Sequence, residues 1–173
     1  MKKALAVLIL TLSWIGLVFY FSSQPSNISA EQSGAVYRFL KKLDNILDIT
    51  QTEWYKGLRA FLIRWWFPNK NPTGEDLVRK SAHFGLYLVL GALFFCLGWL
   101  YSKRYVFSVL LGISLPTVIA VLDEYNQSFR NRGSSLYDVI IDMNGAISGM
   151  TASLIVILAL RLISWLHNKT RGE

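Results

Sequence analysis

Cysteine and histidine are scarce in this chain of 173 residues, and their scarcity excludes several classes of protein. The single cysteine, Cys96, excludes an intramolecular disulfide framework. The two histidines, His83 and His167, lie far apart among the apolar segments, which argues against a phosphatase that uses one histidine as nucleophile and another as acid. The chain also lacks a Walker-type phosphate loop and a GxSxG nucleophile elbow. Common nucleotide-binding and serine-hydrolase sites are therefore excluded.

Hydrophobic residues, by contrast, are abundant and concentrated in blocks. They make up 53% of the chain. Four blocks, at about 4–21, 82–101, 105–124 and 138–166, are close to or above the roughly 20 apolar residues that a helix needs to cross a bilayer. The first follows two lysines, as a signal peptide would, but its run of about 18 apolar residues exceeds the 7–15 of a signal core. We predict an all-α fold, a single domain over 1–173 built as an integral membrane bundle of four transmembrane helices.

Positive charge near the block ends predicts the orientation of this bundle. Basic residues precede the first block, fill the turn between the second and third, and end the fourth: Lys2, Lys3, Lys103, Arg104, Arg161, Lys169 and Arg171. With four spans all of them fall on one side, which the positive-inside rule makes cytoplasmic. We therefore expect both termini in the cytoplasm.

The segment at about 22–80 then lies outside the cytoplasm and is more than a linker. Apolar residues recur at helical spacing between Ala35 and Leu47, which predicts an amphipathic helix. A second follows at 54–68, with aromatic and aliphatic residues on one face and basic residues on the other. Such helices suit the membrane interface. The alternative is a helix packed on the rim of the bundle.

Polar residues gather at the outer ends of three predicted helices. The second opens with RKSAHFGLY, which places His83 and Tyr87 on one face. The third ends in VLDEYNQ, and the fourth begins with YDVIIDMNG, in which Asp138 and Asp142 are four positions apart. An ionisable side chain at the centre of a membrane helix costs about 2.5–3.5 kcal/mol and by default marks a functional site. We expect these side chains to meet at one depth.

The fourth helix carries polar residues deepest into the membrane. Asp142 and Asn144 would be unsatisfied in lipid, so we expect both to face the bundle. Their candidate partners are Arg79, Lys80, His83, Arg130 and Arg132. Gly145 and Gly149 have the spacing that allows close helix approach. Asp138 has a simpler alternative role, as a first-turn acid that stabilises the helix dipole, and Ser134 or Ser135 is a candidate helix cap.

The same residues narrow the chemistry of the site. Five groups could bind a divalent cation (His83, Asp123, Glu124, Asp138 and Asp142), but no recognisable metal spacing connects them, so the sequence predicts no metal and no cofactor. Cations beside carboxylates and amides favour a zwitterionic or phosphate-bearing head group, because arginine can bond phosphate at two points. The predicted ligand-binding residues are Lys80, His83, Asp123, Glu124, Gln127, Arg132, Asp138 and Asp142.

Three motifs resemble the VanZ-like family of bacterial membrane proteins: FSSQPS at 21–26, RKSAHFGLYLVLG at 79–91 and LDEYNQSFRNRGSSLYDVIIDMNG at 122–145. The resemblance implies a small multi-pass protein of the bacterial cytoplasmic membrane, and the founding member of the family is associated with teicoplanin resistance. The matching motif positions are Lys80, Ser81, His83, Phe84, Asp123, Glu124, Gln127, Arg132, Ser135, Asp138, Asp142 and Gly145. The family often has a proline–glycine turn before the loop arginine, where this chain has Phe129, Arg130 and Asn131.

Three functions are compatible with these residues. The favoured hypothesis is non-enzymatic: the site binds a lipid or lipid-linked cell-wall precursor at the outer leaflet and alters glycopeptide susceptibility. The alternative is a membrane enzyme acting on a lipid head group, with His83, Glu124 and Asp142 as candidate catalytic residues. A second alternative is a lipid transporter that uses Asp142 inside the bundle. All three take membrane lipids as partners and none involves nucleic acid.

Overall fold

The computed structural model describes residues 2–68, 70–129 and 135–171. Over these ranges the chain is helical and contains no strand. The elements are α1 (Lys2–Ser22), α2 (Ser26–Leu47), the 3₁₀ turn η1 (Ile49–Gln51), α3 (Glu53–Trp66), α4 (Gly74–Ser102), α5 (Tyr105–Ser128) and α6 (Leu136–Arg171). The predicted all-α fold is confirmed.

Four helices, α1, α4, α5 and α6, are long and apolar enough to cross a membrane, as predicted. Their bounds lie near the predicted ones except at α4, which begins at Gly74 rather than near residue 82. A capping box explains the earlier start. The Thr73 hydroxyl accepts from the Asp76 N–H, while the Asp76 carboxylate accepts from the Thr73 N–H. Two polar turns therefore precede the apolar part of α4.

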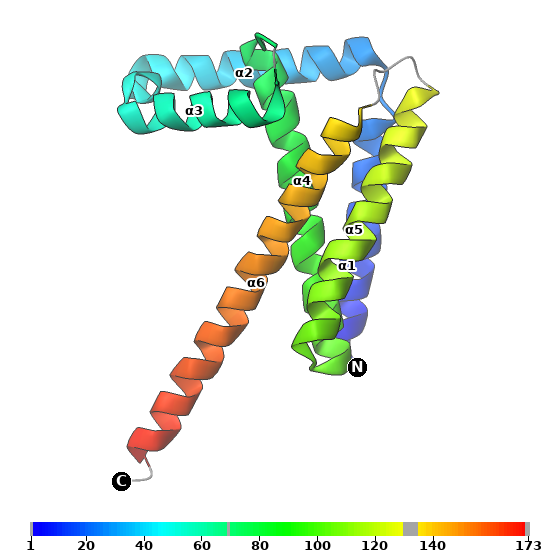
Figure 1. Ribbon diagram of the computed structural model, residues 1–173, viewed down its shortest axis with the longest axis vertical. Coiled ribbons are helices and arrows are strands. Elements are labelled where there is room, and N and C mark those ends of the chain that lie inside the picture. The colour runs from blue at the N-terminus through cyan, green and yellow to red at the C-terminus, as the bar shows by residue number, and fades with distance from the viewer. Residues whose placement is uncertain (1, 69, 130–134, 172–173) are drawn as a thin grey trace.

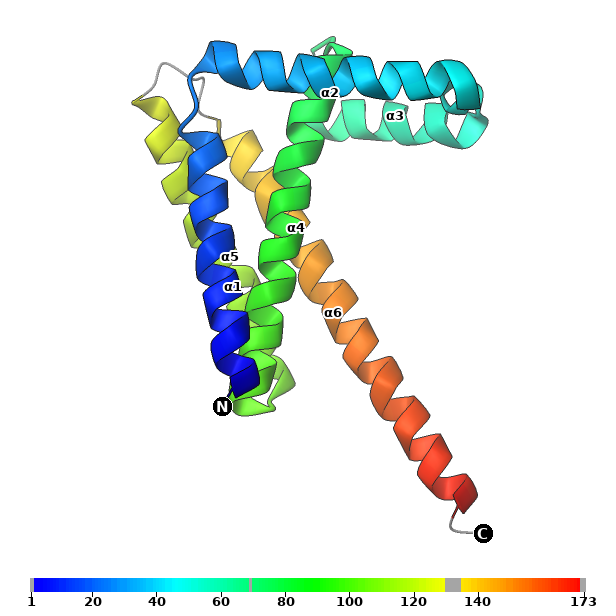
Figure 2. The ribbon, with the colours of Figure 1, turned by 180° about the vertical axis from the view of Figure 1, so that it is seen from behind.

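The helices form a bundle with a side arm (Figure 1). Helix α4 packs against α1, α5 and α6. Helices α2 and α3 run together to one side, roughly across the direction of the spanning helices, at the end where α4 and α6 begin and α5 ends (Figures 1 and 2). We call this the α2–α3 end. Both chain termini lie at the opposite end, which we call the termini end.

The bundle core connects α1 with α4 and α5. Val18, Tyr87, Leu90, Phe94 and Ala120 form a buried cluster. The indole N–H of Trp14 in α1 also donates a hydrogen bond to the Leu86 carbonyl of α4, at 2.9 Å. The first apolar block is thus packed as a member of the bundle.

Glycines bring α4 and α6 into close contact. A Cβ atom added at Gly149 would lie 1.8 Å from the Leu88 carbonyl oxygen, and one at Gly145 would lie 2.4 Å from that of Phe84. At these positions any larger residue would push the two backbones apart. The predicted role of the Gly145–Gly149 pair is confirmed, and the close approach sets the rotation of α6 against α4 that builds the site.

The two predicted amphipathic helices are present as α2 and α3. At the corner between them the Asp44 carboxylate accepts hydrogen bonds from the Thr50 hydroxyl and the Thr50 N–H, which together hold the pKa of Asp44 below its ordinary value. Large apolar residues along α3 are exposed, among them Trp54 at 63% and Trp65 at 64%. This face therefore does not pack on the rim of the bundle. Helix α3 does meet α4 at its end, where the Trp66 ring lies 5.7 Å from the Phe84 ring.

Candidate functional site

Seven of the eight predicted ligand-binding residues lie in described parts of the chain, and all seven are near the α2–α3 end. Helix α4 contributes Lys80 and His83; α5 contributes Asp123, Glu124 and Gln127; α6 contributes Asp138 and Asp142. We call these seven residues the polar cluster. The eighth, Arg132, lies outside the described residues, as do Arg130 and Ser134.

Helices α4 and α6 are joined by two ionisable pairs, one turn apart. The Lys80 Nζ atom lies 2.9 Å from Asp138 Oδ1. One turn deeper, His83 Nδ1 lies 3.7 Å from Asp142 Oδ1. Both helices start at the α2–α3 end and run in the same direction. His83 and Asp142 therefore both lie about one turn farther from that end than Lys80 and Asp138. Asp138 is thus both the first-turn acid expected from the helix dipole and the partner of a lysine on another helix.

Lys80 also connects the site to the side arm. Its ammonium group donates to the Trp66 carbonyl at 2.9 Å and lies 4.4 Å from the centre of the Phe67 ring. A carbonyl, a carboxylate and an aromatic face therefore surround this cation. The end of α3 is fixed beside the polar cluster as a result.

Helix α5 contributes three buried polar residues. Asp123 is completely buried, and Glu124 and Gln127 are nearly so. The Gln127 amide donates to Asp123 Oδ2 at 3.1 Å. Glu124 Oε2 accepts a hydrogen bond from the Ser135 N–H at 2.9 Å, while the Ser135 hydroxyl accepts from the Tyr137 N–H and caps α6. Glu124 therefore ties the end of α5 to the start of α6.

Three members of the polar cluster converge on one point. His83, Asp123 and Asp142 each place a nitrogen or oxygen atom within 4.8 Å of the others. Asp142 is completely buried, and neither of its oxygens has a hydrogen-bond partner among the described residues. Burial of an ionisable carboxyl without hydrogen bonds is costly, so packing does not account for this residue. These three residues are therefore the centre of the candidate site.

One of the predicted burials is wrong. Asn144 is exposed, although Asp142 is buried as expected. Two positions on a helix differ by about 200° in direction, so both residues cannot face the same neighbour. Arg79 is also exposed, and His83 rather than Arg79 is the neighbour of Asp142.

Two features of the site were missing from the predicted residues. Tyr87 is completely buried, and its hydroxyl has no hydrogen-bond partner within the described ranges. Its position four residues after His83 was a usable signal. The contact of Lys80 with Trp66 and Phe67 had no signal in the sequence, because it depends on how the side arm folds back.

The FSSQPS motif also reaches this end of the bundle. The Asn126 amide of α5 donates to the Ser23 hydroxyl at 3.2 Å, just after the end of α1. Ser22 is buried in the same region. Described residues from all three motifs, which are distant in sequence, thus lie near one end of the bundle.

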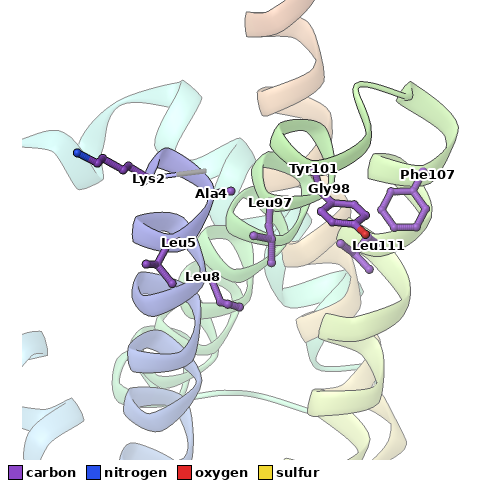
Figure 3. Close-up of a pocket in the computed structure, with 9 residues that line it drawn as sticks. All are labelled: Lys2, Ala4, Leu5, Leu8, Leu97, Gly98, Tyr101, Phe107 and Leu111. Carbon is purple, nitrogen blue, oxygen red and sulfur yellow. The ribbon is translucent and has the colours of Figure 1, made fainter.

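A separate cavity of about 600 Å³ lies toward the termini end, between α1, α4 and α5 (Figure 3). Its lining is aliphatic and aromatic apart from Lys2: Ala4, Leu5, Leu8, Leu97, Gly98, Tyr101, Phe107 and Leu111. It contains none of the groups of the polar cluster, so it is separate from the candidate site.

The fold and the site together define a class: a multi-pass α-helical membrane protein with a buried polar cluster at one end of its bundle. A family model described as VanZ/LLP1 matches residues 7–159, and the chain belongs to that family. No curated protein and no solved structure shows a significant match. The resemblance inferred from the three motifs is confirmed.

Proposed function

We propose that the polar cluster binds the head group of a lipid or lipid-linked cell-wall precursor at the outer face of the bacterial cytoplasmic membrane. The observation that carries this proposal is the convergence of polar side chains from α4, α5 and α6 at one end of an apolar bundle. Sites for membrane ligands need a polar group for the head and an apolar path for the chain. Both termini lie at the other end. The basic residues of the sequence predict that this end faces the cytoplasm.

The chemistry of the cluster supports a head group that carries both signs of charge. Lys80 offers an ammonium group to a phosphate, and the Gln127 amide offers a neutral donor. Carboxylates at Asp123, Glu124 and Asp142 offer acceptors to an amine or hydroxyl. A phosphate linked to an amine or a sugar matches these groups, because the described members of the cluster include both a cation and carboxylates.

The side arm supports a location at the membrane surface. Exposed apolar residues run along α2, including Phe39 and Ile46, and along α3, including Trp54 and Trp65. Tryptophan and tyrosine favour the head-group level of a bilayer, where one end of the ring is wet and the other apolar. Since Lys80 bonds to the end of α3, an arm lying in this layer would hold the polar cluster at head-group depth.

Lipid co-purification tests the proposal. The protein is purified in mild detergent, and the retained lipids are quantified by mass spectrometry for the wild type, Glu124→Gln and Lys80→Met. Two exposed residues of α2, changed as Glu31→Gln and Lys42→Met, serve as matched controls. We expect one lipid class to be enriched on the wild type and the controls and at least tenfold depleted on both site variants. Equal retention by all five proteins would refute the proposal.

A cellular consequence follows for glycopeptides. A protein that holds a lipid-linked precursor at the outer leaflet would limit glycopeptide access to that precursor. Expression should therefore raise the inhibitory concentration of teicoplanin, and Glu124→Gln at equal membrane abundance should abolish the increase. If Glu124→Gln still raised the inhibitory concentration of teicoplanin, the change in susceptibility would not depend on the polar cluster.

One observation favours a second function, that of an enzyme acting on the same head group. The His83 imidazole and the Asp142 carboxyl lie 3.7 Å apart. This is longer than a hydrogen bond, but the hydrogen bonds of an acid–base pair are often long without substrate and shorten when substrate binds. Incubation of the protein with labelled membrane lipids would then give a product that His83→Gln abolishes and His167→Gln retains. Bound lipid recovered unchanged would favour the non-enzymatic function.

A further inference from the structure

Three buried groups of the polar cluster have the composition and spacing of a metal centre, and we propose that His83, Asp123 and Asp142 bind a divalent cation. Their ligand atoms all lie within 4.8 Å of one another. Nitrogen and oxygen ligands held about 2.0–2.2 Å from a cation are separated by about 3–4.4 Å, depending on the angle between them. Rotamer adjustments of a few tenths of an ångström would therefore close these three groups around an ion.

The state of Asp142 points to a ligand at this position. The side chain is completely buried, and no group in the described parts of the chain donates a hydrogen bond to either oxygen. The His83 Nδ1 atom is 3.7 Å from Asp142 Oδ1, beyond hydrogen-bond length. The Tyr87 hydroxyl, one turn along α4 from His83, is also buried without a partner in those ranges. Polar atoms left in this state commonly mark an ion or ligand site.

The closeness of two buried carboxyl groups favours a cation as the ligand. Asp123 and Asp142 are both completely buried, and each has an oxygen within 4.8 Å of the other and of a His83 nitrogen. Carboxylates this close repel one another at low dielectric constant, and a divalent cation bound between them would reduce that repulsion.

The ligand types indicate which cations fit. Carboxylates alone would favour Mg²⁺ or Ca²⁺, whereas an imidazole shifts the preference toward transition ions such as Mn²⁺ and Zn²⁺. Three protein ligands leave coordination positions open, as in metal sites that also bind an exogenous group. The Gln127 amide, which donates to Asp123 Oδ2, supplies the orienting contact typical around metal ligands.

The proposed cation site extends the proposed function without depending on it. A cation held by three protein ligands could take a phosphate oxygen of a head group as a further ligand, which would reconcile an acidic cluster with a phosphate-bearing lipid. The sequence predicted no metal, because 40 positions separate His83 from Asp123 and 19 separate Asp123 from Asp142, and neither interval is a recognised metal spacing. The convergence arises from the crossing of three helices.

Direct metal binding by purified protein tests the site without any lipid assay. The full chain in detergent is stripped with EDTA and titrated with Mn²⁺, with free Mn²⁺ followed by electron paramagnetic resonance and Zn²⁺ used as competitor. We expect one Mn²⁺ per wild-type chain, displaced by Zn²⁺, and at least a tenfold weaker affinity in His83→Gln and in Asp142→Asn. His167→Gln and Glu75→Gln are the matched controls and should bind as the wild type does.

Thermal unfolding of the same proteins separates lost binding from lost folding. Mn²⁺ should raise the midpoint of the wild type and of both controls, and leave the midpoints of His83→Gln and Asp142→Asn unchanged. Stoichiometry well below one in the wild type, or wild-type affinity in folded Asp142→Asn, would overturn the proposal. Lipid retention by EDTA-treated wild type, together with no Mn²⁺ binding, would reject the cation site and leave the proposed function standing.

Discussion

The two halves of α6 are both apolar in sequence, yet they meet the rest of the molecule in different ways. From Ile141 to Met150 the helix buries a stripe that includes Asp142, Ala146 and Gly149 against its neighbours. From Ile155 onward most side chains are exposed, and the helix diverges from the bundle (Figure 1). The first half is rich in small residues and the second in leucine and isoleucine. Because lipid is as apolar as leucine, small residues and polar pairs, rather than hydrophobicity, decide where spanning helices approach.

The comparison also shows why the site lies where it does. A binding site needs side chains in a fixed geometry, and α6 offers one where glycines let its backbone contact α4, which is where the candidate site lies. The same half carries a fully buried carboxyl without a hydrogen-bond partner in the described ranges, which works against stability. Close packing in the first half of α6 thus offsets the cost of burying the Asp142 carboxyl. The second half of α6 has neither this close helix packing nor a buried carboxyl.

The largest effect is expected from a substitution that disrupts the contact between α4 and the close-packed first half of α6. In Gly149→Val the first added carbon alone would lie 1.8 Å from the Leu88 carbonyl oxygen, so α4 and α6 must separate. We expect a loss of about 3 kcal/mol in unfolding free energy, at the upper end of overpacking effects, measured by SDS titration in mixed micelles. Bound Mn²⁺ and retained lipid should fall with it.

Gly16→Val is the matched control for this change. A Cβ at Gly16 has no neighbour within 4 Å, and the residue is exposed on α1. Its unfolding free energy should stay within about 0.5 kcal/mol of the wild type, as for ordinary exposed substitutions. Equal losses in the two variants would show that the loss comes from placing valine in a spanning helix and not from the α4–α6 contact.

Much of the fold could be predicted from the sequence, because a bilayer makes the length of apolar runs decisive. The four spans follow from run length, and both amphipathic helices follow from their periodicity. The start of α4 was misplaced since apolarity begins near residue 82, while the helix begins at a capping box that only Thr73 and Asp76 reveal. Local hydrogen bonds, rather than hydropathy, set that boundary.

The sequence predicted where in the bundle the candidate site lies, but not which of its side chains contact one another. Ends of three helices on one side imply that Lys80, Asp123 and Asp138 lie at similar depth. Which of them touch depends on how each helix is rotated about its axis, and that rotation is set by contacts such as Gly145 on Phe84. This is why Asn144 was assigned to the wrong face.

The second-largest effect concerns the buried carboxyl in the first half of α6, whose burial lowers the stability of the protein. In metal-free protein, Asp142→Asn replaces a buried carboxyl by an amide that can donate to His83 Nδ1. We expect the unfolding free energy to rise by about 2 kcal/mol while Mn²⁺ binding is lost. Glu31→Gln, an exposed change of the same kind on α2, should leave both unchanged. Destabilisation by Asp142→Asn would mean that the carboxyl is structural.

A smaller effect concerns the outer pair of the polar cluster. Lys80 and Asp138 are mostly buried and 2.9 Å apart, so their interaction should exceed that of an exposed salt bridge. A double-mutant cycle of Lys80→Met and Asp138→Asn should give a coupling of about 1 kcal/mol. The exposed neighbour Arg79, changed to Met with Asp138→Asn, provides the reference cycle and should show no coupling. Similar coupling in both cycles would indicate that Asp138 responds to the general positive potential around it and not to a specific ion pair with Lys80.

The smallest effect tests whether the diverging half of α6 is held at all. Arg161 places its guanidinium 4.6 Å from the Trp99 ring and 5.2 Å from the Tyr105 ring, which stack on each other at the turn between α4 and α5. An exposed cation–π contact of this kind contributes about 0.5 kcal/mol. Arg161→Ala should therefore barely change stability but broaden the distance distribution between spin labels at positions 101 and 166, in a Cys96→Ser background. Leu160→Ala, at the exposed residue beside it, should leave the distribution unchanged. A distribution as narrow in Arg161→Ala as in the wild type would mean that this contact does not restrain α6, and that its direction is set by the glycine crossing alone.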